Sequence, residues 1–545
     1  MDKRLMLSIA SLVTGAALLA GASVASPGAV QGQSSPQPRK GGILKFTLFA
    51  GIENIDPQRS YYLPEWQYEW LTGRMLLTFA HKRGALSYRL VDDGARSYTV
   101  SNNGRTYTFH IRRGMKLSNG APLNAKNYEH ALLRVLNPAV GSPLASLLTD
   151  PASVEIVGAT DYNAGRTDTV PGIFTRGSNT LVVKLVRANP LLPTLLALPP
   201  TGAIANNTPF RPITSVSVRH PLPAGGRYYV QEYVPDRSIK IRKNRFYKPL
   251  GAAPTPGIVD GFDYTIGVRQ DQALQLVQNG QSDWAADGLP ETAWSPLFAQ
   301  YGTKGRARVF PTRVVDIAFM NNATGPFANV NVRKSIEWGI DRSALAGVFG
   351  SHGRSPQCSL LTPAIPGYRK CTIYPNTPDL PRARSLASGH TGDHINFWYT
   401  SSTIGTRVHQ LATSQLNAIG FDNIDHRAFS SGLFSALARR GHDCDLAILG
   451  WGGDFPDLYG YVNTLFEAID LDPEADRLLR AAARLTGQKR AAAYGKLDLT
   501  LQRRWAPIAV IDRRNDREFF SARIDTRSIV QSPIYEIDLG KLAAR

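Results

Sequence analysis

At 545 residues the chain is too long for one simple core, and its 43% apolar and 9% aromatic content exclude bulk disorder. The formal net charge of +19 could suit a nucleic acid, but the Lys and Arg residues are scattered, without basic blocks. We therefore expect no nucleic-acid partner. The charge instead indicates attraction to an anionic envelope or to acidic solutes, or simply an Arg-rich composition.

The first 25 residues have the pattern of an export signal. Lys3 and Arg4 precede an apolar run over 5–20, and Ser23-Val24-Ala25 is a suitable cleavage site. A retained transmembrane anchor is the alternative, which the short and interrupted apolar run disfavours. The sequence thus predicts a signal peptide at 1–25 and an extracytoplasmic mature protein, either periplasmic or attached to or secreted from the cell envelope.

Two features follow from the residues around the predicted cleavage site. Leu19-Ala20-Gly21-Ala22 resembles a bacterial lipoprotein box in which Ala22 replaces the cysteine that would carry the lipid. We therefore expect no lipid anchor there. Residues 26–40 are rich in Pro, Gln, Ser and Gly, which predicts a disordered tether.

From residue 41 to about 310, alternating apolar residues and turn dipeptides predict mainly strands. Asn103-Gly104 suits the type I′ turn of a hairpin over 98–111, and Asn124 is a suitable cap for a helix that ends at Asn137. The other predicted elements are strands at 41–48, 180–186, 225–230, 239–242, 262–268 and 283–285, and a short helix at 271–279.

Strands and helices alternate after residue 310, which implies a second α/β lobe. The predicted strands are 314–321, 394–399, 446–449 and 505–511, and helices are predicted over 332–340 and 408–419.

An aromatic cluster follows the first predicted strand. It contains Tyr61, Tyr62, Trp66, Tyr68 and Trp70. Such a cluster indicates either a helix packed by its aromatic face or a surface on which a ligand stacks, and the helix is the more frequent case.

The stretch 445–457 is the strongest candidate for a binding site. Its apolar run predicts a buried strand. The strand is followed by glycines, Trp451, Asp454 and Asp457, and Pro456 prevents further regular pairing. Ligands in open α/β sheets bind where strands end. The alternative is an ordinary turn with a solvated aspartate.

The three cysteines favour an exported protein whose core does not depend on disulfides. Cys358 and Cys371 flank a Pro-rich loop and are candidates for a disulfide, whereas Cys444 is expected to be a buried free thiol. None has the spacing of a metal site.

Catalysis needs a positioned nucleophile and base, or a metal, and no motif for either occurs in the sequence. His390 and His394 lie four residues apart, but neighbouring glycines disfavour the helix that a metal site would need. We expect no enzymatic activity, no metal and no cofactor. A secreted hydrolase acting on peptides or glycosides is the alternative, and a sensor lobe of a membrane receptor is a third possibility.

Several blocks of the chain, in order, resemble the family 5 extracytoplasmic solute-binding proteins of ABC transporters, which include oligopeptide, dipeptide and nickel binders. The blocks are residues 42–57, 107–126, 244–247, 280–283, 319–342 and 451–457.

The resemblance implies a two-lobed, type II periplasmic-binding-protein-like α/β fold. Residues 41–310 and 506–545 would form the first lobe, with an inserted subdomain at about 81–187, and 311–505 the second. Two hinge crossings are expected near 308–316 and 504–512.

The implied function is that of the solute-binding component of an ABC importer, which captures peptides or a similar solute by hinge closure. The expected partners are that solute, a membrane permease and its ATPases, and the protein is expected to be a monomer. In related peptide binders the aspartate of the Trp-x-x-Asp block, here Asp454, pairs with the ligand's α-ammonium. The further candidate ligand-binding residues are Trp451 and Gly453 in the second lobe and Tyr61, Tyr62 and Trp66 in the first.

Overall fold

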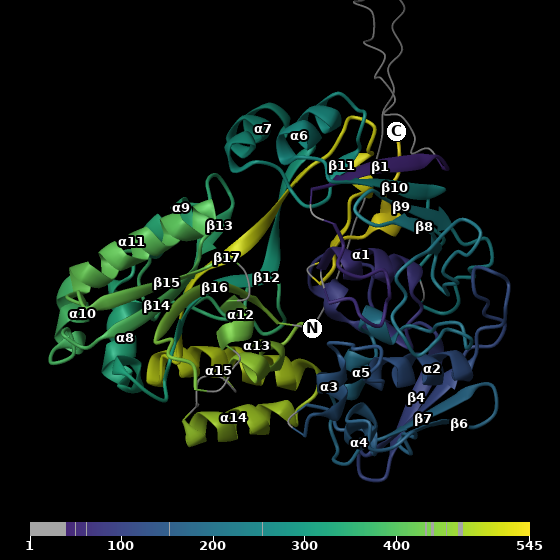
Figure 1. Ribbon diagram of the computed structural model, residues 1–545, viewed down its shortest axis with the longest axis horizontal. Helices are drawn as coiled ribbons and strands as arrows, with labels where there is room; N and C mark the ends of the chain where they lie inside the picture. The colour runs from purple at the N-terminus through teal and green to yellow at the C-terminus, as the bar shows by residue number, and fades with distance from the viewer. Residues whose placement is uncertain are drawn as a thin grey trace, which may run out of the picture. The chain divides into compact units, whose positions relative to one another are not determined.

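The computed structural model describes residues 40–545, except 50, 62, 152, 253, 431–432, 438–440, 454, 467–471 and 533. These residues form two lobes, each built on its own sheet, and a further sheet is inserted in the first lobe (Figure 1). The expected two-lobed α/β fold is confirmed. The signal peptide, the tether up to residue 39, Tyr62 and Asp454 lie outside the described residues.

The main sheet of the first lobe has the strand order β11-β1-β10-β9-β8. β1 runs parallel to β10 and β11, while β9 is antiparallel to β8 and β10. Phe46, Ile241 and Phe262 are among the side chains that form its core. The elements are β1 (Ile43–Leu48), β8 (Tyr228–Val234), β9 (Ser238–Lys243), β10 (Gly261–Ile266), β11 (Trp284–Ala285), α1 (Leu63–Thr72), α6 (Gln270–Gln278) and α7 (Trp294–Tyr301).

The inserted subdomain is a four-stranded antiparallel sheet, β4-β5-β7-β6, covered by α2. Asn102, Asn103 and Gly104 have positive φ at the predicted hairpin turn. Asn124 caps α2 as predicted, since its side chain accepts from Lys126 N at 3.0 Å. The elements are β4 (Ala95–Ser101), β5 (Thr106–Ile111), β6 (Ile173–Thr175), β7 (Thr180–Lys184), α2 (Ala125–Leu136), α3 (Ala145–Thr149), α4 (Ala159–Asn163) and α5 (Leu192–Leu195).

The buried cluster that contains the core of this subdomain also includes residues outside the predicted range of 81–187. One continuous cluster of buried side chains contains Met75 and Leu76 before that range and Leu195 and Ala205 after it. The hairpin of β2 (Leu77–Phe79) and β3 (Leu90–Asp92) adjoins the subdomain.

The second lobe is a six-stranded sheet with helices on both faces, in the order β13-β17-β12-β16-β14-β15 (Figure 1). Side chains of β12 alternate between the faces: Val315 and Ile317 pack with α13 and α15, while Ala318 and Met320 pack with α8 and α11. The strands are β12 (Ala307–Met320), β13 (Arg354–Pro356), β14 (Ile395–Thr400), β15 (Ile424–Phe429), β16 (Leu446–Gly452) and β17 (Ile508–Phe519). The helices are α8 (Val330–Gly339), α9 (Arg342–Gly347), α10 (Leu380–Ala387), α11 (Thr403–Ile419), α12 (Leu433–Leu437), α13 (Leu458–Phe466), α14 (Pro473–Ala483) and α15 (Gly487–Arg504).

Two long antiparallel strands, β12 and β17, connect the lobes (Figure 1). They pair from Ala307–Phe519 at the first lobe to Phe319–Ile508 at the second, and their register shifts between Pro311 and Val315. Residues 508–511 pack in the cores of the second lobe. These four residues therefore pack with the second lobe, and the crossing predicted at 504–512 continues along β17 into the first lobe.

The remaining elements complete the chain. The C-terminal segment forms a short hairpin of β18 (Gln531–Ser532) and β19 (Glu536–Ile537). Short 3₁₀ turns lie at Gly84–Tyr88, Pro199–Thr201, Glu291–Ala293, Pro326–Ala328, Thr526–Ser528 and Leu539–Lys541. Cys358 and Cys371 form a disulfide, and Cys444 is a buried free thiol. No helix in the described part of the chain is long and apolar enough to cross a membrane.

Candidate ligand-binding cleft

The glycine-rich end of β16 lies at the junction between the lobes. The indole of Trp451 is half-buried, packs against the core of the second lobe and donates from Nε1 to Tyr461 O at 2.8 Å. The next residues form a turn whose carbonyl at Gly453 accepts a hydrogen bond from the Arg313 guanidinium. Asp454 itself lies outside the described residues.

Gly453 is required by close packing. An added Cβ would come within 2.7 Å of the Tyr461 ring, closer than real Cβ atoms approach a neighbour. The Tyr461 hydroxyl in turn donates to Arg313 O. Gly453, Tyr461 and Arg313 therefore fix the turn that presents position 454.

Asp457 is held within the second lobe. Its Oδ1 accepts from Tyr459 N at 2.8 Å, and its Oδ2 accepts from Arg490 Nε at 2.6 Å. Both oxygens are thus used to stabilise the loop and the start of α13.

The aromatic cluster of α1 is mainly core. Trp66 is 2% exposed, and its Nε1 donates to Ser60 O at 3.1 Å. It shares one buried cluster with Phe455 of the second lobe and Tyr535. The structure therefore brings the α1 segment and the turn after β16 together, but it does not present the Trp66 ring to a ligand. Tyr61 is 48% exposed and stacks edge-on against Trp66.

Arg313 on β12 is a central cation of this junction. Burial raises the pKa of Tyr461 and of Tyr535, and the nearby Arg313 guanidinium opposes that rise. It acts in the same way on the pKa of Tyr88 and of Glu536. Arg313 was not among the predicted site residues, although its place directly before the apolar run of β12 was a usable signal.

A cavity of about 540 Å³ lies between the first lobe and β17. Its walls are the end of β1, the start of α1, residues 286–291, β17 and Glu536. Five carboxylates line it, Asp287, Glu291, Asp516, Glu518 and Glu536, together with Arg514 and Arg517. The cavity is large enough for a small solute and is predominantly acidic.

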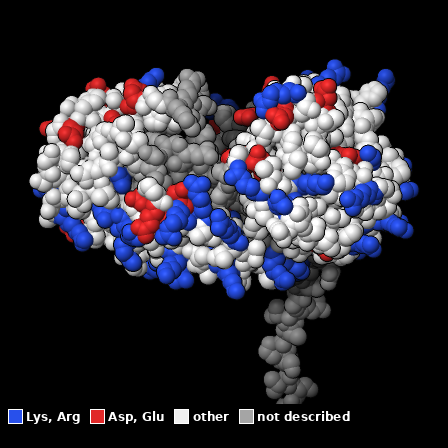
Figure 2. Space-filling model, turned by 90° about the horizontal axis from the view of Figure 1, so that it is seen from below, with Lys and Arg blue, Asp and Glu red and all other residues white. Residues whose placement is uncertain are grey.

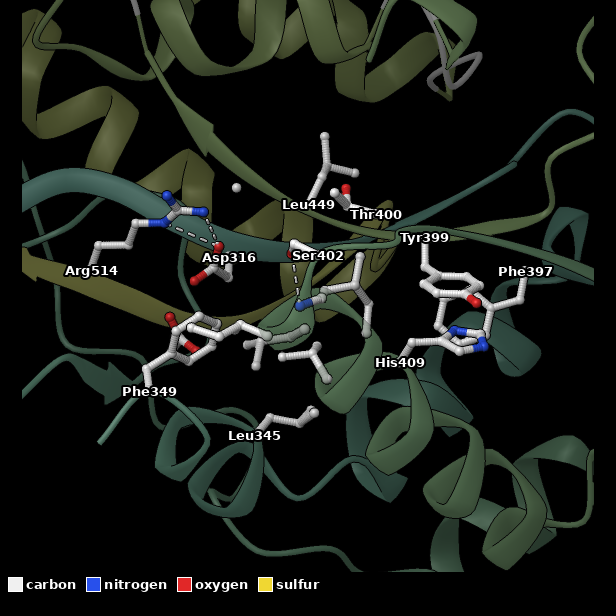
Figure 3. Close-up of a pocket in the computed structure, with 17 residues that line it drawn as sticks. Asp316, Leu345, Phe349, Phe397, Tyr399, Thr400, Ser402, His409, Leu449 and Arg514 are labelled. Atoms are coloured by element: carbon white, nitrogen blue, oxygen red, sulfur yellow. Dashed lines mark hydrogen bonds and ion pairs between the residues drawn. The ribbon is translucent and has the colours of Figure 1, made fainter. Parts of the chain in front are cut away.

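A second pocket, of about 210 Å³, lies in the second lobe at the ends of β14 and β16. Its walls are mostly apolar, and Figure 3 shows Arg514 with Asp316 at one end and Tyr399 with His409 at the other. The Tyr399 and His409 rings stack with centroids 3.8 Å apart, and burial lowers the pKa of His409 to about 4. Arg514 of β17 is a lining residue of both cavities.

The charged end of this pocket contains a carboxyl pair, Asp316 of β12 and Asp512 of β17. Arg514 Nη2 lies 2.6 Å from one oxygen of Asp316, and Arg354 Nε lies 2.7 Å from the other. Burial would raise the pKa of Asp316, but the two guanidinium groups outweigh it and lower that pKa. Asp512 is 1% exposed, and burial together with the Asp316 charge raises its pKa to about 9. The raised pKa favours the protonated form of Asp512 at neutral pH, while Arg354 Nε lies 3.6 Å from its Oδ1.

The surface differs in charge from the cavity. Figure 2 shows Lys and Arg spread widely over the face seen from below, with smaller groups of Asp and Glu. The net charge of +19 is therefore not a property of the cleft. A signal for the acidic cavity was present in the sequence: residues 512–518 are seven consecutive polar residues between two apolar runs.

The comparison with known proteins now decides the family. A profile of the bacterial extracellular solute-binding proteins, family 5, matches residues 89–470. The chain belongs to this family. It is an extracytoplasmic solute-binding protein, and the family assignment does not support the alternative of a secreted hydrolase.

Similar family 5 proteins span most of the chain. The periplasmic oligopeptide-binding protein OppA of Haemophilus influenzae is 22% identical, covering 85% of this chain and 87% of its own length. The probable deoxycholate-binding periplasmic protein YgiS of Escherichia coli is 24% identical, covering 76% and 78%. Both relatives are named as periplasmic proteins.

Solved structures show the same fold. The clavulanic acid biosynthesis oligopeptide binding protein 2 has a TM-score of 0.80 and 21% identity, covering 93% of this chain and 96% of its own. The structure of Haemophilus influenzae OppA in complex with the peptide RPPGFSPFR has a TM-score of 0.69 and 20% identity, covering 93% and 100%.

Proposed function

We propose that this family 5 protein captures peptides in the cleft between its lobes and delivers them to the permease of an ABC importer. The observation that carries the proposal is the cavity of about 540 Å³ between the first lobe and the crossing strand β17, whose Arg514 also lines the smaller cavity of about 210 Å³ in the second lobe. Peptide-binding relatives of similar length support the class of solute. Solute would stabilise a closed arrangement of the lobes, which the permease recognises.

Residue roles in this proposal follow the geometry of the cleft. Asp454 pairs with the α-ammonium of the peptide, and the turn fixed by Gly453 and Arg313 holds it in place. Trp451 and the exposed ring of Tyr61 contact the bound chain from the two lobes. Residues 1–25 direct export and are removed, the mature protein acts as a monomer without a lipid anchor, and no bond in the solute is broken.

The test is calorimetric binding to the mature protein, purified without refolding. The probes are RPPGFSPFR, tetra-alanine and N-acetylated tetra-alanine. Wild type should bind the free peptide about 10–100-fold more tightly than the acetylated one, because only the free peptide offers an ammonium to Asp454. Asp454→Ala should abolish that difference. The proposal fails if neither RPPGFSPFR nor tetra-alanine binds, or if chromatography shows that bound peptide is cleaved.

Deoxycholate is the second probe, because one relative is named for it. An anionic steroid would have to enter a cleft whose larger cavity is lined by five carboxylates. We therefore expect peptides to bind in preference, and native mass spectrometry of the purified protein would identify the solute that accompanies it.

A further inference from the structure

The larger cavity has more carboxylates than its own cations neutralise. Glu291 is paired with Arg517, whose Nη2 lies 2.8 and 2.7 Å from its two oxygens. Arg514 is paired with Asp316, outside this cavity. Among the described residues, no Lys, Arg or His forms an ion pair with Asp516, Glu518 or Glu536. These three residues are called the acidic trio below.

One member of the trio is buried without a cation. Glu518 is 7% exposed, and the hydrogen bond to its Oε2 comes from the neutral indole N–H of Trp284 at 2.5 Å. A buried carboxylate without a cationic partner is costly, and burial raises the pKa of Glu518 well above its usual range. The neighbouring charges of Asp516 and Glu536 raise that pKa further. A cation placed beside these carboxyl groups would therefore favour their ionised forms.

The backbone supports the same interpretation. Glu536 lies in β19 with a backbone φ of 59°. Residues other than Gly, Asn and Asp adopt this conformation rarely. Strain of this kind persists where the surrounding structure imposes it and is frequent at ligand sites. The hairpin of β18 and β19 therefore places this carboxylate on the cavity wall despite its cost.

The cation that suits this cavity is organic and not a metal ion. No group of three or more His, Cys, Asp or Glu side chains within the described ranges is arranged to hold a metal. The cavity of about 540 Å³ is instead of a size that admits a long side chain. Ammonium and guanidinium groups are the peptide cations that carboxylates bind through charge-assisted hydrogen bonds.

We propose that Asp516, Glu518 and Glu536 bind the cationic side chain of a Lys or Arg residue in the captured peptide, so that the protein selects basic peptides. The inference rests on the proposed peptide-binding function and adds a site of selectivity to it. It is separate from Asp454, which would take the α-ammonium. The basic surface and the acidic cavity then have different roles, since the cavity alone chooses the solute.

Ligand binding to the trio is expected to release protons. Burial raises the pKa of Asp516 to about 7, against the opposing charges of Arg354 in β13, Arg514 in β17 and Arg313 in β12. The carboxyls of Glu518 on the same strand and Glu536 on β19 have raised pKa values as well. A bound cation favours the ionised carboxylates, so affinity for a basic peptide should rise between pH 6 and pH 8.

The test compares tetra-alanine derivatives that carry one Lys at each position in turn with matched peptides that carry norleucine. Norleucine keeps the length of the lysine side chain but lacks its charge. Calorimetry on the full mature protein should show at least one Lys peptide bound about 10–100-fold more tightly than its norleucine partner. Titrations in buffers of different ionisation enthalpy should show proton release for that Lys peptide only.

Substitutions within the acidic trio test whether these carboxylates produce the preference for the Lys peptide. Glu536→Gln and Asp516→Asn should each reduce the Lys-to-norleucine ratio while tetra-alanine still binds, and tetra-alanine binding shows that they are folded. The control is Asp161→Asn, an exposed carboxylate on α4 that pairs with Arg166 away from the cleft. Equal affinity for the Lys and norleucine peptides, or a ratio unchanged in both trio variants, would overturn the selectivity and leave peptide capture intact. Failure of every peptide to bind wild type would overturn peptide capture and the selectivity with it.

Discussion

At the scale of single residues, the cleft depends on side chains that have structural and electrostatic roles at once. Arg313 hydrogen-bonds the turn at Gly453 and also opposes the raised pKa of Glu536. Asp457 uses one oxygen for Tyr459 N in its own loop and the other for Arg490 of α15. The partners of Asp457 thus give it a structural role, and Asp454 remains the proposed ligand-binding aspartate of this motif.

Gly453→Ala should destabilise the second lobe and weaken peptide binding. The new methyl group would overlap the Tyr461 ring, and forcing an extra carbon into a packed site costs about 1–3 kcal/mol. Chemical denaturation measures the free energy of unfolding. Gly392→Ala is the matched control, because nothing lies within 4 Å of its added Cβ. Equal stability of the two variants would contradict the packing argument.

Asp512→Asn should stabilise the protein, and by more at pH 8 than at pH 5. The folded pKa of about 9 lies above the unfolded value, so the folded state keeps a proton that the unfolded state has lost. The stability from Asp512 is therefore fully present below the unfolded pKa, near 4, and is lost as pH rises towards 9. Asparagine does not titrate.

The difference in unfolding free energy between Asp512→Asn and wild type should widen by up to about 1.4 kcal/mol per pH unit in this range. Thermal and chemical denaturation at pH 5, 6, 7 and 8 would measure it. Exposed Asp161→Asn provides the comparison for a carboxylate in water. A difference independent of pH would show that Asp512 is already ionised in the folded protein.

At the scale of elements, β12 and β17 each contribute to both lobes, and their pairing is irregular in the middle. The register shifts between Pro311 and Val315, where Pro311 lacks an N–H and Thr312 Oγ1 donates to Arg514 O at 3.0 Å. Regular pairing at either end anchors each lobe. The irregular centre is where we expect the hinge to bend.

The loop closed by the Cys358–Cys371 disulfide contributes to the stability of the second lobe. Leu360 and Leu361 in this loop pack into the core of the second lobe, and their N–H groups donate to Asp498 at 3.0 Å. Replacing both cysteines with serine should lower the free energy of unfolding by about 3 kcal/mol, since a disulfide that closes so short a loop constrains the unfolded chain.

Denaturation with and without a reductant would check this prediction. Reductant should destabilise wild type and leave the double-serine variant unchanged, because Cys444 forms no disulfide. A double variant as stable as wild type would show that the loop is held by its packing and by Asp498 alone.

At the scale of the whole molecule, the contacts between lobes define what closure must change. Phe455 of the second lobe already packs in a core cluster of the first, while the larger cavity lies between the first lobe and β17. We expect bound peptide to reduce the radius of gyration, because it adds contacts to both lobes across the cleft.

Small-angle scattering with and without RPPGFSPFR would measure this change. Asp454→Ala should need a higher peptide concentration to reach the same compact state, since it loses affinity and not the hinge. An unchanged radius of gyration at saturating peptide would contradict hinge closure.

Much of the fold was available from the sequence because it depends on local patterns. The hairpin at Asn103-Gly104, the cap at Asn124 and the alternation of β12 depend on turn chemistry and periodicity within a few residues. The aromatic segment 61–70 was predicted to be core more readily than a ligand surface, but Trp66 was also a candidate ligand-binding residue, and α1 buries it. The boundary between the second lobe and the second crossing was harder to predict, because no local sequence pattern separates 506–511 from the residues that follow.

The sequence by itself determined the family and the two-lobed fold class, and it made the end of β16 a candidate site and Cys358 and Cys371 candidates for a disulfide. Only the tertiary structure decided that Asp516, Glu518 and Glu536 share one cavity, that Asp512 meets Asp316, and that Arg313 supports Gly453. The reason is physical. Local geometry is set by neighbours along the chain, whereas burial and charge coupling depend on groups that folding brings together from distant segments.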